Sequence, residues 1–274
     1  MPFLKIIRPF NCIFAALTVF FGAIYFADAL QNFPILFAVI SAMLIAAGGY
    51  VMNDFFDIPI DIINKPNRVL PSGKITPKTA YLYAVFLFIS GMIFGFLTGN
   101  IYCVGIAIIN TLILFFYAKT FKMKILTGNL LVAYSAGSAF VYGGLVNDNL
   151  SNSLILAFYA FFYTLIREFI KDAEDISGDS KYNARTLAIV LGKKKIVLIS
   201  FIPFFAITVY TLFLFYTHSV SLFTFIALIL FVVVPLFLFL LYLTKKTGKA
   251  NFSAISTYMK VDMLVLLIIF FLRM

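Results

Sequence analysis

The stretch PILFAVISAMLIAAGGYVMNDFFDIPID, residues 34–61, begins as an apolar run and ends in three aspartates. Its apolar part has about the 20 residues that a helix needs to cross the hydrocarbon layer of a bilayer. Asp54, Asp57 and Asp61 follow at the spacing Asp-x-x-Asp-x-x-x-Asp. Because ionised side chains are costly in a membrane, acids placed at the end of a span indicate a function.

A second stretch, REFIKDAEDISGD at residues 167–179, repeats this spacing with Asp172, Asp175 and Asp179. Together with Glu168 and Glu174, the two stretches hold eight of the eleven acidic residues of the chain. Clustered carboxylates without histidine or cysteine partners favour hard cations such as Mg²⁺. The alternative is that the acids only solvate the ends of loops, but solvation does not require the same spacing twice.

Composition indicates an integral membrane protein. Hydrophobic residues make up 63% and charged residues 12% of the 274 residues, whereas soluble domains have roughly 45–50% and about 25%. We expect an all-α fold in which one domain, residues 1–274, forms a bundle of nine transmembrane helices. The expected spans are 11–30, 34–53, 80–98, 100–117, 126–146, 153–170, 195–216, 221–243 and 259–273.

The distribution of positive charge orients these spans. With the N-terminus in the cytoplasm, twenty of the twenty-one Lys and Arg residues fall on the cytoplasmic side, and Arg273 is the exception. This asymmetry follows the positive-inside rule. The net charge of +10 therefore needs no nucleic acid partner, and we expect a multi-pass protein of the cell membrane that contacts anionic lipid headgroups.

Both acidic stretches end spans that emerge on this cytoplasmic side, four spans apart. Each is followed by a similar short sequence, NRVL at 67–70 and ARTL at 184–187. We interpret this as a parallel repeat of two four-helix units around a central cavity, with the acids facing each other. Pro59 and the pair Ser177-Gly178 predict that the first two acids of each motif lie in the last helical turn and the third in a loop.

Basic and polar groups near the acids suit a diphosphate, since arginine binds phosphate bidentately and lysine acts as a point charge. These groups are Asn53, Arg68, Lys74, Lys119, Lys122, Arg167, Lys171 and Arg185. Tyr117 could add a phenol. Arg8 and Asn11, which open the first span, are candidates for a second polar substrate. Orientation of the chain or anchoring at the interface explains any one of these residues equally well. Asp148 and Asp262 are isolated and are expected to mark the ends of spans.

The run NDFFDIPID, residues 53–61, resembles the first aspartate-rich motif of the UbiA superfamily of intramembrane prenyltransferases, and residues 172–179 resemble the second. Arg68 with LPSGK at 70–74, and Tyr117 with Lys122, also match family patterns. The resemblance covers the whole chain. Residues 167–179 are most similar to the archaeal branch that makes ether lipids, the digeranylgeranylglyceryl phosphate synthases. Ala173 and Ser177 depart from the larger aliphatic residue and the acid that are more common there.

The resemblance implies transfer of a geranylgeranyl group from its diphosphate to the free hydroxyl of geranylgeranylglyceryl phosphate, with release of diphosphate. It implies Mg²⁺ held by the six motif aspartates, Asp54, Asp57, Asp61, Asp172, Asp175 and Asp179. The diphosphate would be bound by Asn53, Arg68, Tyr117, Lys122 and Lys171. Arg8 and Asn11 would hold the phosphate of the acceptor. The oligomeric state, the tail length and the group that accepts the proton stay open.

Two other functions stay open at the level of the sequence. One is prenylation of an aromatic ring, as for 4-hydroxybenzoate in quinone synthesis. The other, from a different class, is transport of a divalent cation or an organic anion. Transporter sites usually lie near the middle of the bilayer on broken helices, whereas these acids lie at the ends of spans, which favours an enzyme.

Overall fold

The computed structural model describes residues 1–25, 27, 31–179 and 186–272, and within these residues every regular element is helical. The all-α prediction is therefore confirmed. The chain forms two compact units. Unit 1 comprises Met1–Lys122 and Ser135–Ala157, and unit 2 comprises Met123–Tyr134 and Phe158–Met274. Each unit carries one acidic motif.

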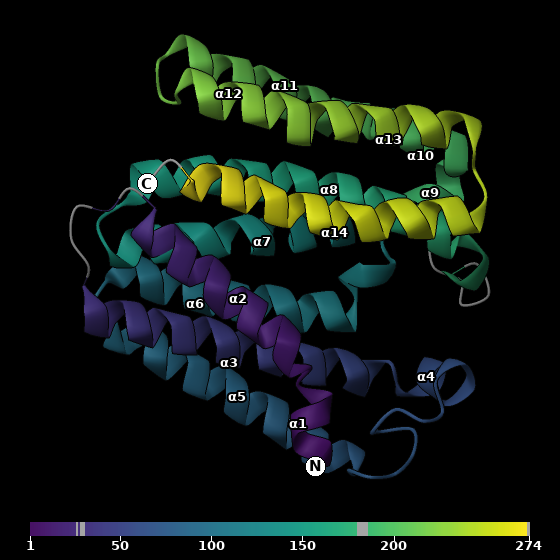
Figure 1. Ribbon diagram of the computed structural model, residues 1–274. Helices are drawn as coiled ribbons and strands as arrows, with labels where there is room; N and C mark the ends of the chain where they lie inside the picture. The colour runs from purple at the N-terminus through teal and green to yellow at the C-terminus, as the bar shows by residue number, and fades with distance from the viewer. Residues whose placement is uncertain (26, 28–30, 180–185, 273–274) are drawn as a thin grey trace. The chain divides into compact units, whose positions relative to one another are not determined.

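Unit 1 is built around the helix that ends in the first motif. Its helices are α1 (Pro2–Ile6), α2 (Pro9–Ile24), α3 (Asn32–Phe56), α4 (Ile58–Asn64), α5 (Pro77–Leu97), α6 (Ile101–Lys119), and parts of the 3₁₀ turn η1 (Phe121–Met123), of α7 (Thr127–Val146) and of α8 (Leu150–Asp179). Helix α3 packs against α2, α5 and α6. Figure 1 shows α4 extending beyond the end of α3. The central position of α3 fixes the place of the motif at its end.

Side chains at the other end of unit 1 join α2 to the α7–α8 connection. Asn147 Nδ2 donates to the carbonyl of Ala23 at 3.0 Å, and Asn149 Nδ2 donates to the carbonyl of Tyr25 at 2.5 Å. The backbone N–H of Gln31 donates to Asn147 Oδ1 at 2.9 Å. Helix α2 therefore runs from the end of unit 1 that carries the motif to the opposite end.

Unit 2 contains the remainder of α7 and α8 and the C-terminal helices. These are α9 (Leu187–Leu191), α10 (Lys193–Ile199), α11 (Phe201–Tyr216), α12 (Leu222–Leu228), the π-helical segment η3 (Ile229–Val233), α13 (Val234–Lys245) and α14 (Lys249–Phe271). Helices α12, η3 and α13 form one apolar stretch. The π-helical segment ends two residues before Pro235, which lacks the N–H that a regular α-helix needs.

Eight helices of the described residues are long and apolar enough to cross a membrane, and they correspond to the second to ninth predicted spans. The first predicted span, 11–30, overlaps α2, which has 16 residues. A helix of this length rises about 24 Å, less than the roughly 30 Å of a typical hydrocarbon core. The predicted boundary near Gly99 is confirmed, because α5 ends at Leu97, α6 begins at Ile101, and Gly99 has φ +74°.

Three details of the prediction are wrong. Helix α14 begins at Lys249, ten residues before the predicted span. Asp262 does not mark a span end: it lies inside α14 and is buried, and its Oδ2 accepts from the Tyr163 hydroxyl at 2.5 Å. Helix α8 continues through Ser177-Gly178, so Asp179 is helical. Packing within unit 2 outweighs the local preference of these short polar sequences for loops.

Candidate active site

The first motif lies where α3 gives way to α4. Asp54 is in the last turn of α3, Asp57 joins the two helices, and Asp61 is in the first turn of α4. Pro59 cannot donate a backbone hydrogen bond, so α3 stops there, but proline is tolerated in the first turn of the next helix. The prediction that Asp61 hangs in a loop is therefore wrong. Its carboxylate is at the positive end of α4, where the helix dipole is favourable.

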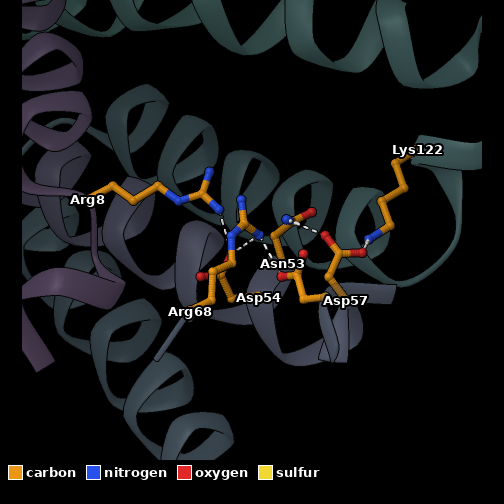
Figure 2. Close-up of polar contacts among 7 residues, drawn as sticks. Arg8, Asn53, Asp54, Asp57, Arg68 and Lys122 are labelled. Carbon is orange, nitrogen blue, oxygen red and sulfur yellow. Dashed lines mark hydrogen bonds and ion pairs between the residues drawn. The ribbon is translucent and has the colours of Figure 1, made fainter. Parts of the chain in front are cut away.

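Asp54 and Asp61 share a cation. Arg68 Nη1 lies 2.6 Å from Asp61 Oδ2 and 3.4 Å from Asp54 Oδ1. Arg8 Nη2 lies 2.5 Å from the same Asp54 Oδ1. Asp54 and Asp61 are buried, and a buried carboxylate is stable only when it is paired or neutralised. The two arginines provide this pairing (Figure 2).

Asp57 is held on both oxygens. Lys122 Nζ forms an ion pair with Oδ1, and Asn53 Nδ2 donates to Oδ2 at 2.8 Å. Asn53 lies one helical turn before Asp57, so their side chains share a face. Figure 2 shows Asp57 between Asn53 and Lys122. The structure therefore brings together three cations and one amide that the sequence assigned to substrate phosphates. They bind the carboxylates of the first motif, and they are Arg8, Arg68, Lys122 and Asn53.

Local folding explains where two of these cations come from. The segment after α4 turns back, with Ser72 N–H donating to the Arg68 carbonyl at 3.0 Å and Val69 and Leu70 buried in the core of unit 1. The buried pair anchors Arg68 beside the carboxylates. Lys122 lies in the 3₁₀ turn η1, which directly follows α6. Lys74 and Lys119 are exposed and have no ion pair among the described contacts.

The second motif lies in unit 2 on the last two turns of α8. Residues at the spacing of Asp172, Asp175 and Asp179 fall within an arc of about 60° on a regular helix. Asn129 Nδ2, from α7, donates to Asp172 Oδ2 at 2.9 Å. Asp175 and Lys171 are exposed. The side chain of Asp179, and all of Arg185, lie outside the residues that the structure describes.

The candidate acceptor residues meet at a tyrosine that sequence reasoning missed. The Cζ atom of Arg8 lies 5.2 Å from the ring centroid of Tyr50, and the side-chain amide of Asn11 lies beside the Tyr50 phenol. Tyr50 is one turn before Asp54, a spacing that could have indicated its place on the same face. Tyr117 is half-buried near the end of α6. Arg167 pairs with Glu168 at 3.1 Å.

The donor set fits Mg²⁺ bound together with a phosphate substrate. No group of three or more acidic, histidine or cysteine side chains among the described residues forms a ready-made metal cage. The carboxylates of the first motif bind cations instead, since like charges repel and opposite charges pair. Mg²⁺ usually takes only one or two carboxylates and completes its shell with water and phosphate oxygens. Asp54, Asp57 and Asp61 offer carboxylate oxygens for one or two such ligands, and a phosphate substrate and water would complete the shell.

Comparison with known proteins decides the family. Residues 15–264 match the UbiA prenyltransferase family. The chain belongs to this family. The digeranylgeranylglyceryl phosphate synthase of Methanosphaera stadtmanae is 35% identical to it over 269 residues, which cover 98% of this chain and 97% of the relative. The predicted membership of the UbiA superfamily is thereby confirmed.

Solved structures of UbiA proteins share the fold. One, from work on digeranylgeranylglyceryl phosphate synthase in membranes, has a TM-score of 0.84 and 30% sequence identity, and covers 98% of this chain and 96% of that chain. A UbiA homologue from Archaeoglobus fulgidus bound to DMAPP and Mg²⁺ has a TM-score of 0.73 and 15% identity over 97% of this chain and 99% of that chain. The second likeness concerns the fold alone.

Proposed function

We propose that this UbiA family member transfers a geranylgeranyl group from geranylgeranyl diphosphate to the free hydroxyl of geranylgeranylglyceryl phosphate, a step of archaeal ether-lipid synthesis. The observation that carries this proposal is the end-to-end similarity to the digeranylgeranylglyceryl phosphate synthase of M. stadtmanae. The cation-rich cluster around the first motif agrees with two phosphorylated substrates. Both lipid tails would stay in the membrane while the polar groups react at its surface.

Mg²⁺ is the proposed cofactor, with the motif aspartates as its ligands. A bound Mg²⁺ would neutralise the diphosphate and stabilise the charge that develops as the carbon–oxygen bond breaks. Arg68 and Lys122 would exchange their carboxylate partners for phosphate oxygens, which keeps the cluster close to electrically neutral. Asn53 orients Asp57. The proposed ligands are Asp54, Asp57 and Asp61 in unit 1 and Asp172, Asp175 and Asp179 in unit 2; Tyr117 and Lys171 would also contact the diphosphate.

Arg8 and Asn11 are the proposed residues for the acceptor phosphate. Arg8 is the N-cap of α2 and Asn11 is in its first turn, which contains no acidic residue. The N-terminus of a helix carries a partial positive charge, and a cationic side chain adds to it. A phosphate is therefore favoured at this end of α2, close to the carboxylates that would hold the metal and diphosphate.

The proposed topology has nine spans in the cell membrane, namely α2 and the eight longer apolar segments. The N-terminus would lie in the cytoplasm. The two aspartate motifs would face one cavity on the cytoplasmic side. Each motif would come from one copy of a four-helix repeat, and both copies would belong to a single domain. The similar spacing of the motifs and the distribution of basic residues support this arrangement. The ends of α2 at opposite ends of unit 1 agree with a short spanning helix.

The test is turnover by the purified protein with Mg²⁺ and geranylgeranyl diphosphate, with products identified by mass spectrometry. We expect product with geranylgeranylglyceryl phosphate and none with 4-hydroxybenzoate. Asp57→Ala and Asp175→Ala should each lower turnover by roughly 100-fold or more. Asp148→Ala, which changes an exposed acid bonded to Gln31, is the matched control. Prenylation of 4-hydroxybenzoate alone would reject the proposed acceptor, and full activity in both aspartate variants would reject the metal assignment.

A further inference from the structure

Tyr50 contacts both residues assigned to the acceptor phosphate. Its ring lies under the guanidinium of Arg8, with 5.2 Å between Arg8 Cζ and the ring centroid. Its phenol lies beside the side-chain amide of Asn11. A guanidinium over an aromatic face is attracted by the ring quadrupole, most strongly where water is partly excluded. Tyr50 is half-buried, so this contact fixes the plane of the guanidinium.

The backbone of Arg8 depends on such contacts. Arg8 has φ 54° and ψ 67°, in the left-handed region that residues other than glycine rarely adopt. A residue persists there only where its surroundings hold it. In unit 1 its side chain is held by the Tyr50 ring on one side and by Asp54 Oδ1, at 2.5 Å, on the other.

Under the proposed function only one of these two contacts survives catalysis. Asp54 would bind Mg²⁺, and its charge would then no longer be available to Arg8. Tyr50 carries no charge that the metal competes for. The aromatic ring and the phenol can therefore keep Arg8 and Asn11 aimed at a phosphate while Asp54 serves the metal.

We propose that Tyr50 is a positioning residue that holds Arg8 and Asn11 in place and so gives the site its preference for an acceptor that carries a phosphate. This inference rests on the proposed function for the position of the acceptor. It assigns to Tyr50 a role in binding one substrate and none in the departure of diphosphate.

The experiment measures binding and not turnover. Calorimetric titration in detergent with Mg²⁺ compares geranylgeranylglyceryl phosphate with the same lipid lacking phosphate, for wild type, Tyr50→Leu, Tyr50→Phe and Tyr102→Leu. Tyr102 is an exposed tyrosine in the first turn of α6 and serves as the matched control. We expect Tyr50→Leu to weaken binding of the phosphate lipid by roughly 5- to 30-fold and Tyr50→Phe, which keeps the ring but loses the phenol, by roughly 2- to 5-fold. Binding of the lipid without phosphate should not change.

The outcomes separate this inference from the proposed function. Equal losses for both lipids in Tyr50→Leu, or no loss, would overturn the inference, as would a wild type that does not prefer the phosphate lipid. If Tyr50→Leu does not insert into membranes, the smaller phosphate-specific loss in Tyr50→Phe decides, and its absence counts against the inference. The KM for geranylgeranyl diphosphate should stay within about twofold in Tyr50→Phe. Failure of the proposed function would show as absent turnover by the wild type.

Discussion

Asn129 is one partner of the second motif and offers a test at the scale of one side chain. It is buried, and its Nδ2 donates to Asp172 Oδ2 at 2.9 Å. A hydrogen bond to a charged group contributes about 1.5–3 kcal/mol. We therefore expect Asn129→Ala to lower kcat/KM by roughly 10- to 100-fold, with insertion unchanged. Asn129→Asp should be worse, because a second carboxylate beside Asp172 repels it.

The control for this prediction is Asn251→Ala. Asn251 bonds the Tyr242 hydroxyl and the Lys246 carbonyl at the start of α14, so its loss should leave kcat/KM within about twofold. Steady-state kinetics at saturating Mg²⁺ would provide the comparison. An Asn129→Ala variant as active as Asn251→Ala would mean that the hydrogen bond to Asp172 has no part in the reaction.

The carboxylates of the site could be predicted from the sequence, whereas their partners could be predicted only in part. An acid at the end of an apolar run stands out because its placement is costly. Arg68 follows from its charge and its proximity to Asp61 along the chain, and Lys122 follows from its charge near the end of a predicted span. Tyr50 and Asn129 could not be predicted, since a tyrosine or asparagine within a span has many structural uses. Tyr50 gains its partner through the packing of α2 on α3, and Asn129 gains its partner through the contact of α7 with α8.

Close approach of α2 and α7 supports a prediction at the scale of the helix. A Cβ atom added at Gly143 would lie 1.9 Å from the Val19 carbonyl oxygen, and one added at Gly22 would lie 2.2 Å from the Phe140 carbonyl oxygen. Backbone atoms cannot move aside as a flexible side chain can. We expect Gly143→Ala to destabilise unit 1 by about 1–3 kcal/mol, visible as a lower melting temperature in detergent.

Gly105→Ala is the matched control, because a Cβ atom there meets nothing within 4 Å. Alanine is a better helix former than glycine, so the melting temperature of this variant should be unchanged or slightly raised. Equal melting temperatures for the two variants would show that α2 and α7 are not held at this distance.

Hydropathy predicts which segments form membrane-spanning helices more reliably than it predicts where those helices begin and end. The start of α5 is a regular cap, since Thr76 Oγ1 accepts from the Thr79 N–H at 3.2 Å and Pro77 occupies the first helical position. The ends of α8 and α14 are different. Polar residues extend both helices beyond their apolar runs, and such extensions are stabilised by contacts within unit 2 that hydropathy does not record.

At the scale of the whole molecule, the number of spans decides on which side the site lies. Helix α2 has 16 residues, yet Arg8 at its start bonds Asp54 while Asn149 bonds Tyr25 at its other end. Since α3 returns from that other end to Asp57, the start of α2 and the end of α3 share one end of unit 1. If α2 and α3 both cross the bilayer, the N-terminus and the segment after α4 lie on the same side.

Cysteine labelling in right-side-out and inverted vesicles tests this arrangement in a background where the buried Cys12 and Cys103 are replaced by alanine. Single cysteines at the exposed positions Leu4 and Lys65 should react with an impermeant maleimide only in inverted vesicles, because the positive-inside rule places both in the cytoplasm. Ser219→Cys, in the connection between α11 and α12, should react only in right-side-out vesicles. A bundle with eight spans would place Leu4 and Lys65 on opposite sides, and reaction of Lys65→Cys from the outside would move the proposed site away from its cytoplasmic substrates.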